Sequence, residues 1–307
     1  MSKSRIYTKI IAIFIGLIFI LSASLKLFSL ESVDLFFYEH RVFNWTLTTI
    51  LSRLLICIEA VLGLMLVFGV YPKIGLYISQ IFLVLFTIYI LVKPYIFTLS
   101  KENCYCFGEI IALNDKQTIY KNIILLLLSL LLVKYRPKKL RKSKLILILS
   151  IISVGLTVFI VKPPDIISNK IYNRGIEINH NAMQEVFDLE EVKSFDIRKG
   201  RKMLCFYSTH CKYCSSAARK IDVIRQRNNI SSNSIFELYW GSPDSVDKVH
   251  KNKDISYAFI SPGIFLDATK NRQPVIILLE NGEIIKTYKL TNLNERYIGE
   301  FLNKEEI

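Results

Sequence analysis

The stretch "MLCFYSTHCKYCSSAARKIDVIR", residues 203–225, decides the fold of the C-terminal part of the chain. Its start, 203–207, is a continuous apolar run typical of a short buried strand, whereas 215–225 has the apolar spacing of an amphipathic helix. Cys211 and Cys214 therefore fall at a strand-to-helix turn. Amide donors and the positive end of the helix dipole stabilise a thiolate there, so we expect a pKa for Cys211 below the usual value of about 8.5.

The segments that follow predict a single α/β domain. They contain apolar strands at 235–240 and 257–260, a helical stretch near 244–252, a hairpin that turns at "ENGE" (280–283), and a closing helix from about 293. This order, with Gln273-Pro274 entering the penultimate strand, resembles the thioredoxin fold. The resemblance implies that Pro274 is cis and packs beside the cysteine pair, that Cys211 attacks a substrate and that Cys214 resolves the product.

The sequence departs from the thioredoxin pattern at Cys205. Many thioredoxins carry a buried acid at that strand position to assist proton transfer, whereas Cys205 is best interpreted as a small core residue. Either His210 or an unidentified group would take over that assistance. The alternative for Cys211 and Cys214 is half of a zinc site, but this domain lacks a second ligand pair at suitable spacing. We therefore predict redox chemistry and no metal.

The N-terminal half has the composition of a membrane protein. The chain is 51% hydrophobic yet 21% charged, which indicates two parts of different character. Five stretches are apolar enough to span a bilayer: 8–28, 47–70, 74–92, 119–134 and 145–161. The first also resembles a secretory signal, but its apolar pattern continues past "SAS" at 22–24, so we expect a retained helix.

The positive charge is concentrated in a way that predicts orientation. The formal net charge is +14, and "KYRPKKLRKSK" (134–144) holds seven basic residues and no acid. Such a run between apolar segments is typical of a cytoplasmic loop rather than a nucleic-acid patch. Lys3, Arg5 and Lys9 precede the first span, and Lys73 lies between the second and third spans. These residues and the 134–144 run fall on alternate connections, which should share the cytoplasmic side. We therefore expect a multi-pass protein of the bacterial cytoplasmic (inner) membrane, with the C-terminal domain in the periplasm or outside.

A second cysteine pair lies in "ENCYCFGEI", residues 102–110, on the same predicted external side. A disulfide between Cys104 and Cys106 would close a tight ring, and strained, exposed bridges are oxidising and exchange readily. A purely structural staple is disfavoured because it would remove little entropy from the unfolded chain. A soft-metal site, for example for Cu(I), stays open as an alternative.

The membrane half carries the residues of a known pattern. "CYCFG" (104–108) before a helix with Lys121-Asn122, "SASLKLF" (22–28) and "EAVLGLMLVFG" (59–69) together resemble the MauE/DoxX-like membrane family over about residues 5–135. Members resemble the four-helix bundles of DsbB and vitamin K epoxide reductase, and MauE is implicated in disulfide formation in a periplasmic methylamine dehydrogenase subunit. The connection 29–46 lacks the cysteines of an epoxide-reductase shuttle pair, which the thioredoxin-like domain could supply.

Glu59 stands out within the second span. It lies about 18 Å along that helix, near the midplane, where a charge costs at least about 2.5 kcal/mol. We expect it to face the bundle interior, as a proton relay or quinone-site residue or as a neutral packing carboxyl. Arg53 is a candidate for the same site, although six residues of separation place it on another face of the helix. Lys26 is expected to snorkel, and Cys57 to be inert.

The predicted architecture is a four-helix transmembrane domain at 1–135, a basic cytoplasmic loop with a fifth helix and a linker at 136–164, and an extracytoplasmic thioredoxin-like domain at 165–307. The predicted function is a membrane-bound thiol-disulfide oxidoreductase that acts on extracytoplasmic thiol or disulfide proteins. Electrons would pass between the Cys211/Cys214 pair and the Cys104/Cys106 pair. The sequence does not determine the direction of this transfer. The sequence identifies no cofactor with certainty, and a quinone stays open as final acceptor. The alternative is a membrane-anchored metal- or partner-binding chaperone that uses the same cysteines.

Overall fold

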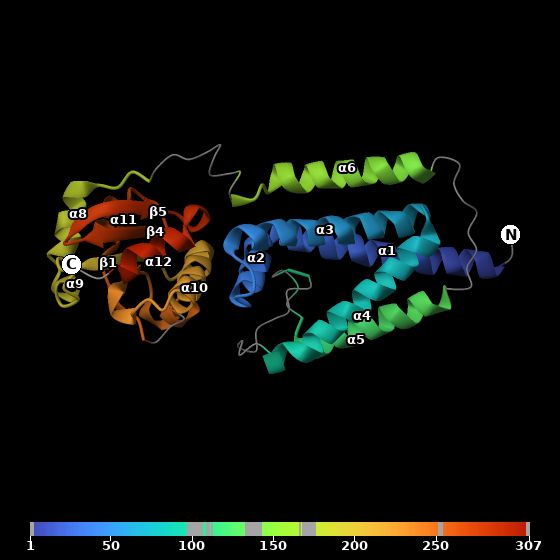
Figure 1. Ribbon diagram of the computed structural model, residues 1–307, viewed down its shortest axis with the longest axis horizontal. Coiled ribbons are helices and arrows are strands. Elements are labelled where there is room, and N and C mark those ends of the chain that lie inside the picture. The colour runs from blue at the N-terminus through green and yellow to red at the C-terminus, as the bar shows by residue number, and fades with distance from the viewer. Residues whose placement is uncertain are drawn as a thin grey trace. The chain divides into compact units, whose positions relative to one another are not determined.

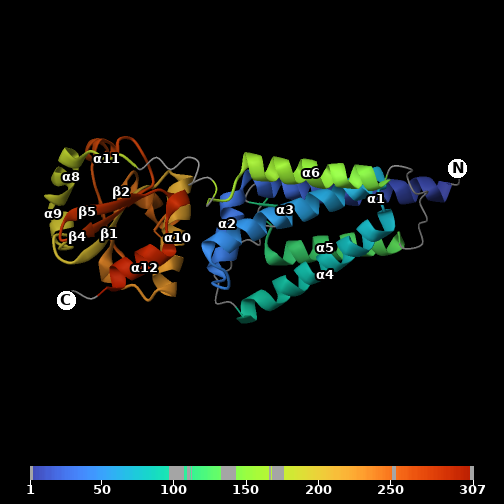
Figure 2. The same cartoon turned by 45° about the horizontal axis from the view of Figure 1, so that its top comes forward.

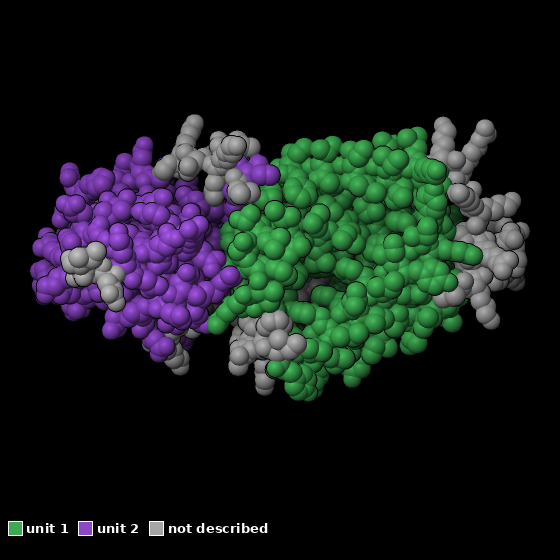
Figure 3. Space-filling view, in the orientation of Figure 1, with its two compact units in different colours: residues 1–164 green, residues 165–307 purple. Residues whose placement is uncertain are grey.

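The computed structural model describes residues 3–96, 107–108, 111, 113–132, 143–165, 167, 176–250 and 254–304. The chain divides into two compact units, residues 1–164 and 165–307 (Figure 3). The first is helical and the second is an α/β domain, so the predicted fold class of a helical membrane part followed by an α/β part is confirmed. Cys104 and Cys106 lie outside the described residues.

The first unit is built from helices (Figure 1). In chain order they are α1 (Lys3–Phe28), α2 (Leu30–Glu39), α3 (Trp45–Phe68), α4 (Pro72–Ile96), α5 (Asp115–Leu131) and α6 (Ser143–Val161). Among the described residues, α1, α3, α4 and α6 are long and apolar enough to cross a membrane. The described part of α5 has 17 residues. Helix α2 occupies the connection in which the sequence predicted a loop.

Local sequence signals set the helix ends. The Asn44 side chain accepts a hydrogen bond from the Leu47 amide at the start of α3, and Gly69 ends that helix in the left-handed conformation. Asn114 and Gln117 form a reciprocal capping box at the start of α5. These caps satisfy amides that would otherwise lack partners at each helix terminus.

Helices α1 and α3 approach closely because glycines face each other. A Cβ atom placed on Gly16 would lie 2.7 Å from the Gly63 carbonyl oxygen, and one on Gly63 would lie 2.7 Å from the Gly16 oxygen. Small residues of this kind allow transmembrane helices to pack backbone to backbone. Ser22 of α1 also contacts Glu59 of α3, so the two helices run antiparallel. This packing brings polar side chains of both helices together.

The second unit contains one five-stranded sheet in the order β3-β2-β1-β4-β5. The strands are β1 (Arg201–Ser208), β2 (Ile235–Trp240), β3 (Ser256–Phe259), β4 (Val275–Glu280) and β5 (Glu283–Tyr288). Strand β1 is parallel to β2 and antiparallel to β4, and β4 and β5 form the predicted hairpin. Asn281 and Gly282 both have positive φ in its turn, as a tight two-residue hairpin requires.

Helices cover both faces of this sheet (Figure 2). One face packs on α8 (His180–Phe187) and α11 (Pro262–Thr269), with α9 (Glu190–Lys193) beside α8. The opposite face carries α10 (Lys212–Arg227) and α12 (Glu295–Asn303). Short 3₁₀ turns η1 (Ser232–Ser234), η2 (Pro243–Lys248) and η3 (Leu290–Asn292) complete the unit. Cys211 and Cys214 lie at the start of α10, on the face of the sheet that α10 covers.

Candidate functional site

The cysteine pair of the second unit sits where a buried strand feeds a helix. Strand β1 ends at Ser208, and Cys211 is the N-cap of α10 with extended backbone angles. The Cys211 sulfur accepts a hydrogen bond from the Cys214 amide at 3.3 Å. A helix N-terminus offers free amides and a positive partial charge, so this position favours a thiolate.

The two sulfurs have opposite electrostatic environments. Cys211 is half-buried, and its pKa is lowered to about 7, chiefly by the hydrogen bond that the Cys214 thiol donates and also by the backbone amides of Cys214 and Tyr213, against the opposing effect of burial. Cys214 is fully buried and accepts a hydrogen bond from the Ser208 amide. Burial and its role as donor to Cys211 raise the Cys214 pKa. Near neutral pH, Cys211 is thus the more readily ionised thiol, and Cys214 keeps its proton.

Pro274 lies beside the end of β1 that leads to the cysteines. The Gln273–Pro274 peptide bond is cis, the geometry that the thioredoxin resemblance implies. Val275, the next residue, pairs with Phe206 in the antiparallel β1–β4 ladder. Pro274 therefore enters the sheet next to the C-terminal end of β1, which positions it toward the turn that carries Cys211.

A buried acid on β2 is a candidate functional residue that was not predicted from the sequence. Glu237 is the register partner of Cys205 and is 2% exposed. Its carboxylate accepts a hydrogen bond from the Tyr239 hydroxyl at 2.7 Å and lies 2.7 Å from His250 Nδ1. A single acid in the apolar strand "IFELYW" was the available signal. His210, the residue named for this role from sequence, is instead exposed and contacts Thr209.

Glu237 is electrostatically linked to the cysteine face of the sheet. Burial raises the pKa of Tyr239 first, and the charge of Glu237 and its hydrogen bond with the Tyr239 hydroxyl add to that rise. Burial, followed by the Glu237 charge, likewise raises the pKa of Cys205. The core beneath Cys214 therefore contains a carboxylate, a phenol and an imidazole in one hydrogen-bonded chain.

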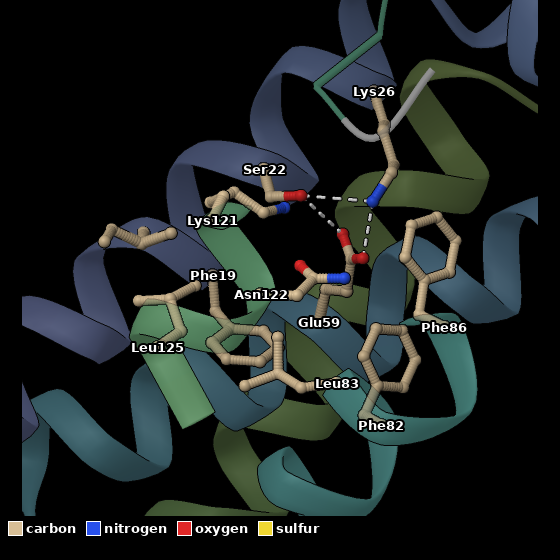
Figure 4. A pocket seen from close by; sticks show the side chains of 11 residues that line it. Phe19, Ser22, Lys26, Glu59, Phe82, Leu83, Phe86, Lys121, Asn122 and Leu125 are labelled. Carbon is tan, nitrogen blue, oxygen red and sulfur yellow. Dashed lines mark hydrogen bonds and ion pairs between the residues drawn. The ribbon is translucent and has the colours of Figure 1, made fainter. Parts of the chain in front are cut away.

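In the first unit, Glu59 is paired with Lys26 (Figure 4). Lys26 Nζ lies 2.5 Å from the Glu59 carboxylate and 3.1 Å from Ser22 Oγ, which itself donates to Glu59. Glu59 faces the interior as expected, being 4% exposed. The expected snorkelling of Lys26 is wrong, because Lys26 is equally buried and its ammonium turns inward to the acid.

The structure does not bring Arg53 to Glu59. The Arg53 guanidinium binds both oxygens of Asp34 on α2, at 2.8 and 2.7 Å, and donates to the Lys162 carbonyl after α6. Arg53 thus connects three segments of the first unit. Its contacts indicate a structural role in joining α3 to the middle of α2 and to the end of α6.

Gly108 packs closely against the C-terminal end of α1. A Cβ atom on Gly108, whose φ is +65°, would lie 1.9 Å from Ser29 Oγ and 2.7 Å from the Leu25 carbonyl oxygen. Lys121 Nζ lies 4.5 Å from the centre of the Phe107 ring, a cation–π contact. Gly108 is required for this close approach, since any side chain would meet α1.

Comparison with known proteins bears on the first unit most directly. A family model described as "Methylamine utilisation protein MauE" matches residues 4–135. The chain is a MauE-like membrane protein with a C-terminal α/β domain. The match covers α1 to α5 of the MauE-like unit (residues 1–164), including the Lys26–Glu59 pair and Gly108.

A second similarity extends beyond the MauE-like unit. "Protein TlpB" of Flavobacterium psychrophilum is 24% identical over 273 aligned residues, which cover 74% of this chain and 74% of that protein. That share is larger than the first unit alone can supply, so the likeness reaches into the α/β domain. No solved structure matches the chain. Among the described residues, no group of three or more His, Cys, Asp and Glu side chains could hold a metal ion.

Proposed function

We propose that this protein is a membrane-bound thiol-disulfide oxidoreductase whose α/β part is a thioredoxin-like domain outside the cytoplasm. The observation that carries the proposal is the asymmetry of the Cys211/Cys214 pair. One thiol at a helix N-terminus has a pKa of about 7, and the other is buried behind it with its proton retained. The strand order, the cis bond at Pro274 and the likeness to TlpB support the same reading.

The reaction is thiol-disulfide exchange. In the reductase direction, the Cys211 thiolate attacks a substrate disulfide. A disulfide between Cys211 and one substrate sulfur forms as the substrate S–S bond breaks, and the other substrate sulfur leaves as a thiolate that takes up a proton. Cys214 then loses its proton and attacks the Cys211 sulfur. This step releases the second substrate thiol and leaves a Cys211–Cys214 disulfide. The reverse sequence oxidises a substrate dithiol with the same residues.

Glu237 is the group that would receive the Cys214 proton. A thiol as buried as Cys214 cannot hand its proton directly to bulk water, so a protein base is needed. Glu237 lies in the same buried layer as Cys214, and hydrogen bonds link its carboxylate to Tyr239 and His250. In this role Glu237 takes the place of the acid that Cys205 replaces on β1.

The membrane-bound partner in the proposed route is Cys104/Cys106. The charge distribution along the sequence supports a common side of a bacterial inner membrane for that loop and the α/β domain. The neighbouring Gly108 fixes where the loop rejoins the helices. Electrons would pass from substrate thiols to Cys211/Cys214, then to Cys104/Cys106, and onward to an acceptor of the quinone class. A reductase would use the opposite direction.

Activity measurements on the full-length protein in nanodiscs test this function. Reduction of a fluorescent disulfide peptide should be lost in Cys211→Ser and should stop at a mixed disulfide in Cys214→Ser. Cys205→Ser is the control, because Cys205 is as buried as Cys214 but lies outside the exchanging pair. Equal activity in Cys211→Ser and Cys205→Ser would rule the proposal out. The redox state of each pair in cells then gives the direction, with oxidised pairs indicating an oxidase.

A further inference from the structure

A small polar cavity lies inside the MauE-like unit, at the Lys26–Glu59 pair (Figure 4). Its polar lining consists of Ser22, Lys26, Glu59, Lys121 and Asn122. Phenylalanine and aliphatic side chains from α1, α4 and α5 form the remaining wall. Four helices therefore contribute to one site, and the polar groups gather where the surroundings are apolar.

Asn122 presents an unsatisfied acceptor at this cavity. It is 2% exposed, and its Oδ1 atom has no hydrogen-bond partner. The orientation of the amide is fixed by Thr87, whose hydroxyl donates to the Leu83 carbonyl oxygen and must accept from Asn122 Nδ2 at 3.1 Å. Oδ1 is therefore the atom of the Asn122 amide that lacks a hydrogen-bond partner. A buried acceptor without a partner costs about 1–3 kcal/mol, so a donor should be present in the folded protein.

The size of the cavity identifies that donor. The cavity volume is about 30 Å³. One water molecule needs roughly 10–15 Å³ of such space, whereas a cavity that accepts a benzene ring measures about 150 Å³. The site therefore has room for about two waters and lacks room for a quinone ring. Water also matches the lining, since it donates to Asn122 and Glu59 and accepts from lysine.

We propose that water occupies this cavity and, together with Glu59, forms a proton-exchange site within the membrane unit. A carboxylate held by an ammonium and a hydroxyl, next to bound water, is placed to take a proton from that water and return it. The cavity lies close to where the chain leaves the Cys104/Cys106 loop, because Lys121 contacts Phe107 and Gly108 packs one turn from Lys26.

The hydration of the site stands on the structure alone, and its proton role rests on the proposed function. When a dithiol is oxidised by a quinone-class acceptor, one S–S bond forms and two electrons and two protons move to the acceptor, which becomes a quinol. Glu59 would carry one of those protons in transit. The quinone itself would bind elsewhere, since the cavity is too small for its ring.

Hydroxyl-radical footprinting of the full-length protein in nanodiscs tests the hydration. Radicals formed from bound water oxidise the side chains beside it. Leu125 lines the cavity and Leu62 does not, yet both are leucines that are 3% exposed. We expect several-fold more oxidation of Leu125 than of Leu62, falling to the Leu62 level in Asn122→Leu. Equal oxidation in the wild type would overturn the proposal, as would protection of Leu125 by a soluble benzoquinone.

A second measurement tests the proton role separately. Glu59→Gln keeps the shape and the water but cannot exchange the proton, so quinone-dependent oxidation of the membrane thiols should fall on the order of 100-fold. Glu59→Asp should recover part of the rate. Leu125 labelling should persist in Glu59→Gln. An unchanged oxidation rate in that variant would overturn the proton role, whereas absence of thiol exchange in the wild type would instead refute the proposed function.

Discussion

Glu237 lies directly opposite Cys205, as its register partner across the parallel β1–β2 ladder. The pairing places a buried acid one strand away from the position at which the sequence analysis sought one. The same face of the sheet is covered by α10, which carries Cys214. The acid, its Tyr239 and His250 partners and the Cys214 thiol therefore share one buried layer.

Replacing Glu237 tests whether this acid receives the Cys214 proton. Glu237→Gln should slow resolution of the Cys211 mixed disulfide by about 10- to 100-fold, because the carboxylate that accepts the proton is removed. Stopped-flow resolution measurements check this, with Cys211 alkylation followed in parallel. Alkylation should change little, and Glu237→Asp should recover part of the resolution rate. Resolution at the wild-type rate in Glu237→Gln would show that the acid has a structural role alone.

The reactivity of Cys211 should depend on pH in a defined way. Its pKa is lowered to about 7, so the thiolate is present above pH 7 and is lost as the pH falls through that value. Iodoacetamide labelling of the reduced protein should therefore be half-maximal near pH 7. Cys214, whose pKa is raised by burial, should stay unlabelled through pH 9. A half-maximal pH near 9 for Cys211 would contradict stabilisation of its thiolate by the Cys214 thiol and the backbone amides of Cys214 and Tyr213.

Removing one partner of the buried Lys26–Glu59 pair should strongly destabilise the MauE-like unit. Lys26→Met leaves a buried carboxylate unpaired, which costs about 3–5 kcal/mol. The double variant Lys26→Met/Glu59→Gln should recover much of that loss. Reversible unfolding in detergent gives the free energies. The more exposed Lys162–Glu31 pair serves as control, with an expected effect of about 1 kcal/mol or less. Equal losses at both pairs would contradict the inward pairing.

Gly108 should tolerate no side chain. Gly108→Ala forces a Cβ into Ser29 and the Leu25 carbonyl at a positive φ, so we expect a destabilisation of about 1–3 kcal/mol. Gly155→Ala on α6 is the matched control, because nothing lies within 4 Å of the added atom. Thermal unfolding compares the two variants. A lower melting temperature for Gly155→Ala than for Gly108→Ala would show that the Gly108 contact with α1 is absent.

The sequence was sufficient where local pattern determines structure. Strand β2 lies at the predicted residues 235–240, and the cysteine pair lies at the predicted helix start. A few consecutive residues are enough to predict a strand from its apolar run or a helix N-terminus from its capping pattern. Orientation of the chain and pairing of Cys104 with Cys106 stay predictions, since no described residue tests them.

Pairings between distant elements were not accessible from the sequence. Glu237 contacts His250, which is 13 residues away in the sequence. Glu59 contacts Lys26 on another helix, 33 residues away. Neither spacing is a helix or strand repeat, so the choice of partner depends on packing. For Glu59 that packing is set by the Gly16–Gly63 approach, which the sequence shows as two unremarkable glycines.

Exchange between the two cysteine pairs is tested most directly by trapping it. Full-length protein carrying Cys214→Ser together with Cys104→Ser or Cys106→Ser is oxidised in its native membrane, digested and searched by mass spectrometry. We predict a disulfide-linked peptide that joins Cys211 to the remaining cysteine of the loop in at least one pairing. Its absence from both pairings, with each cysteine recovered unlinked, would contradict the proposed transfer.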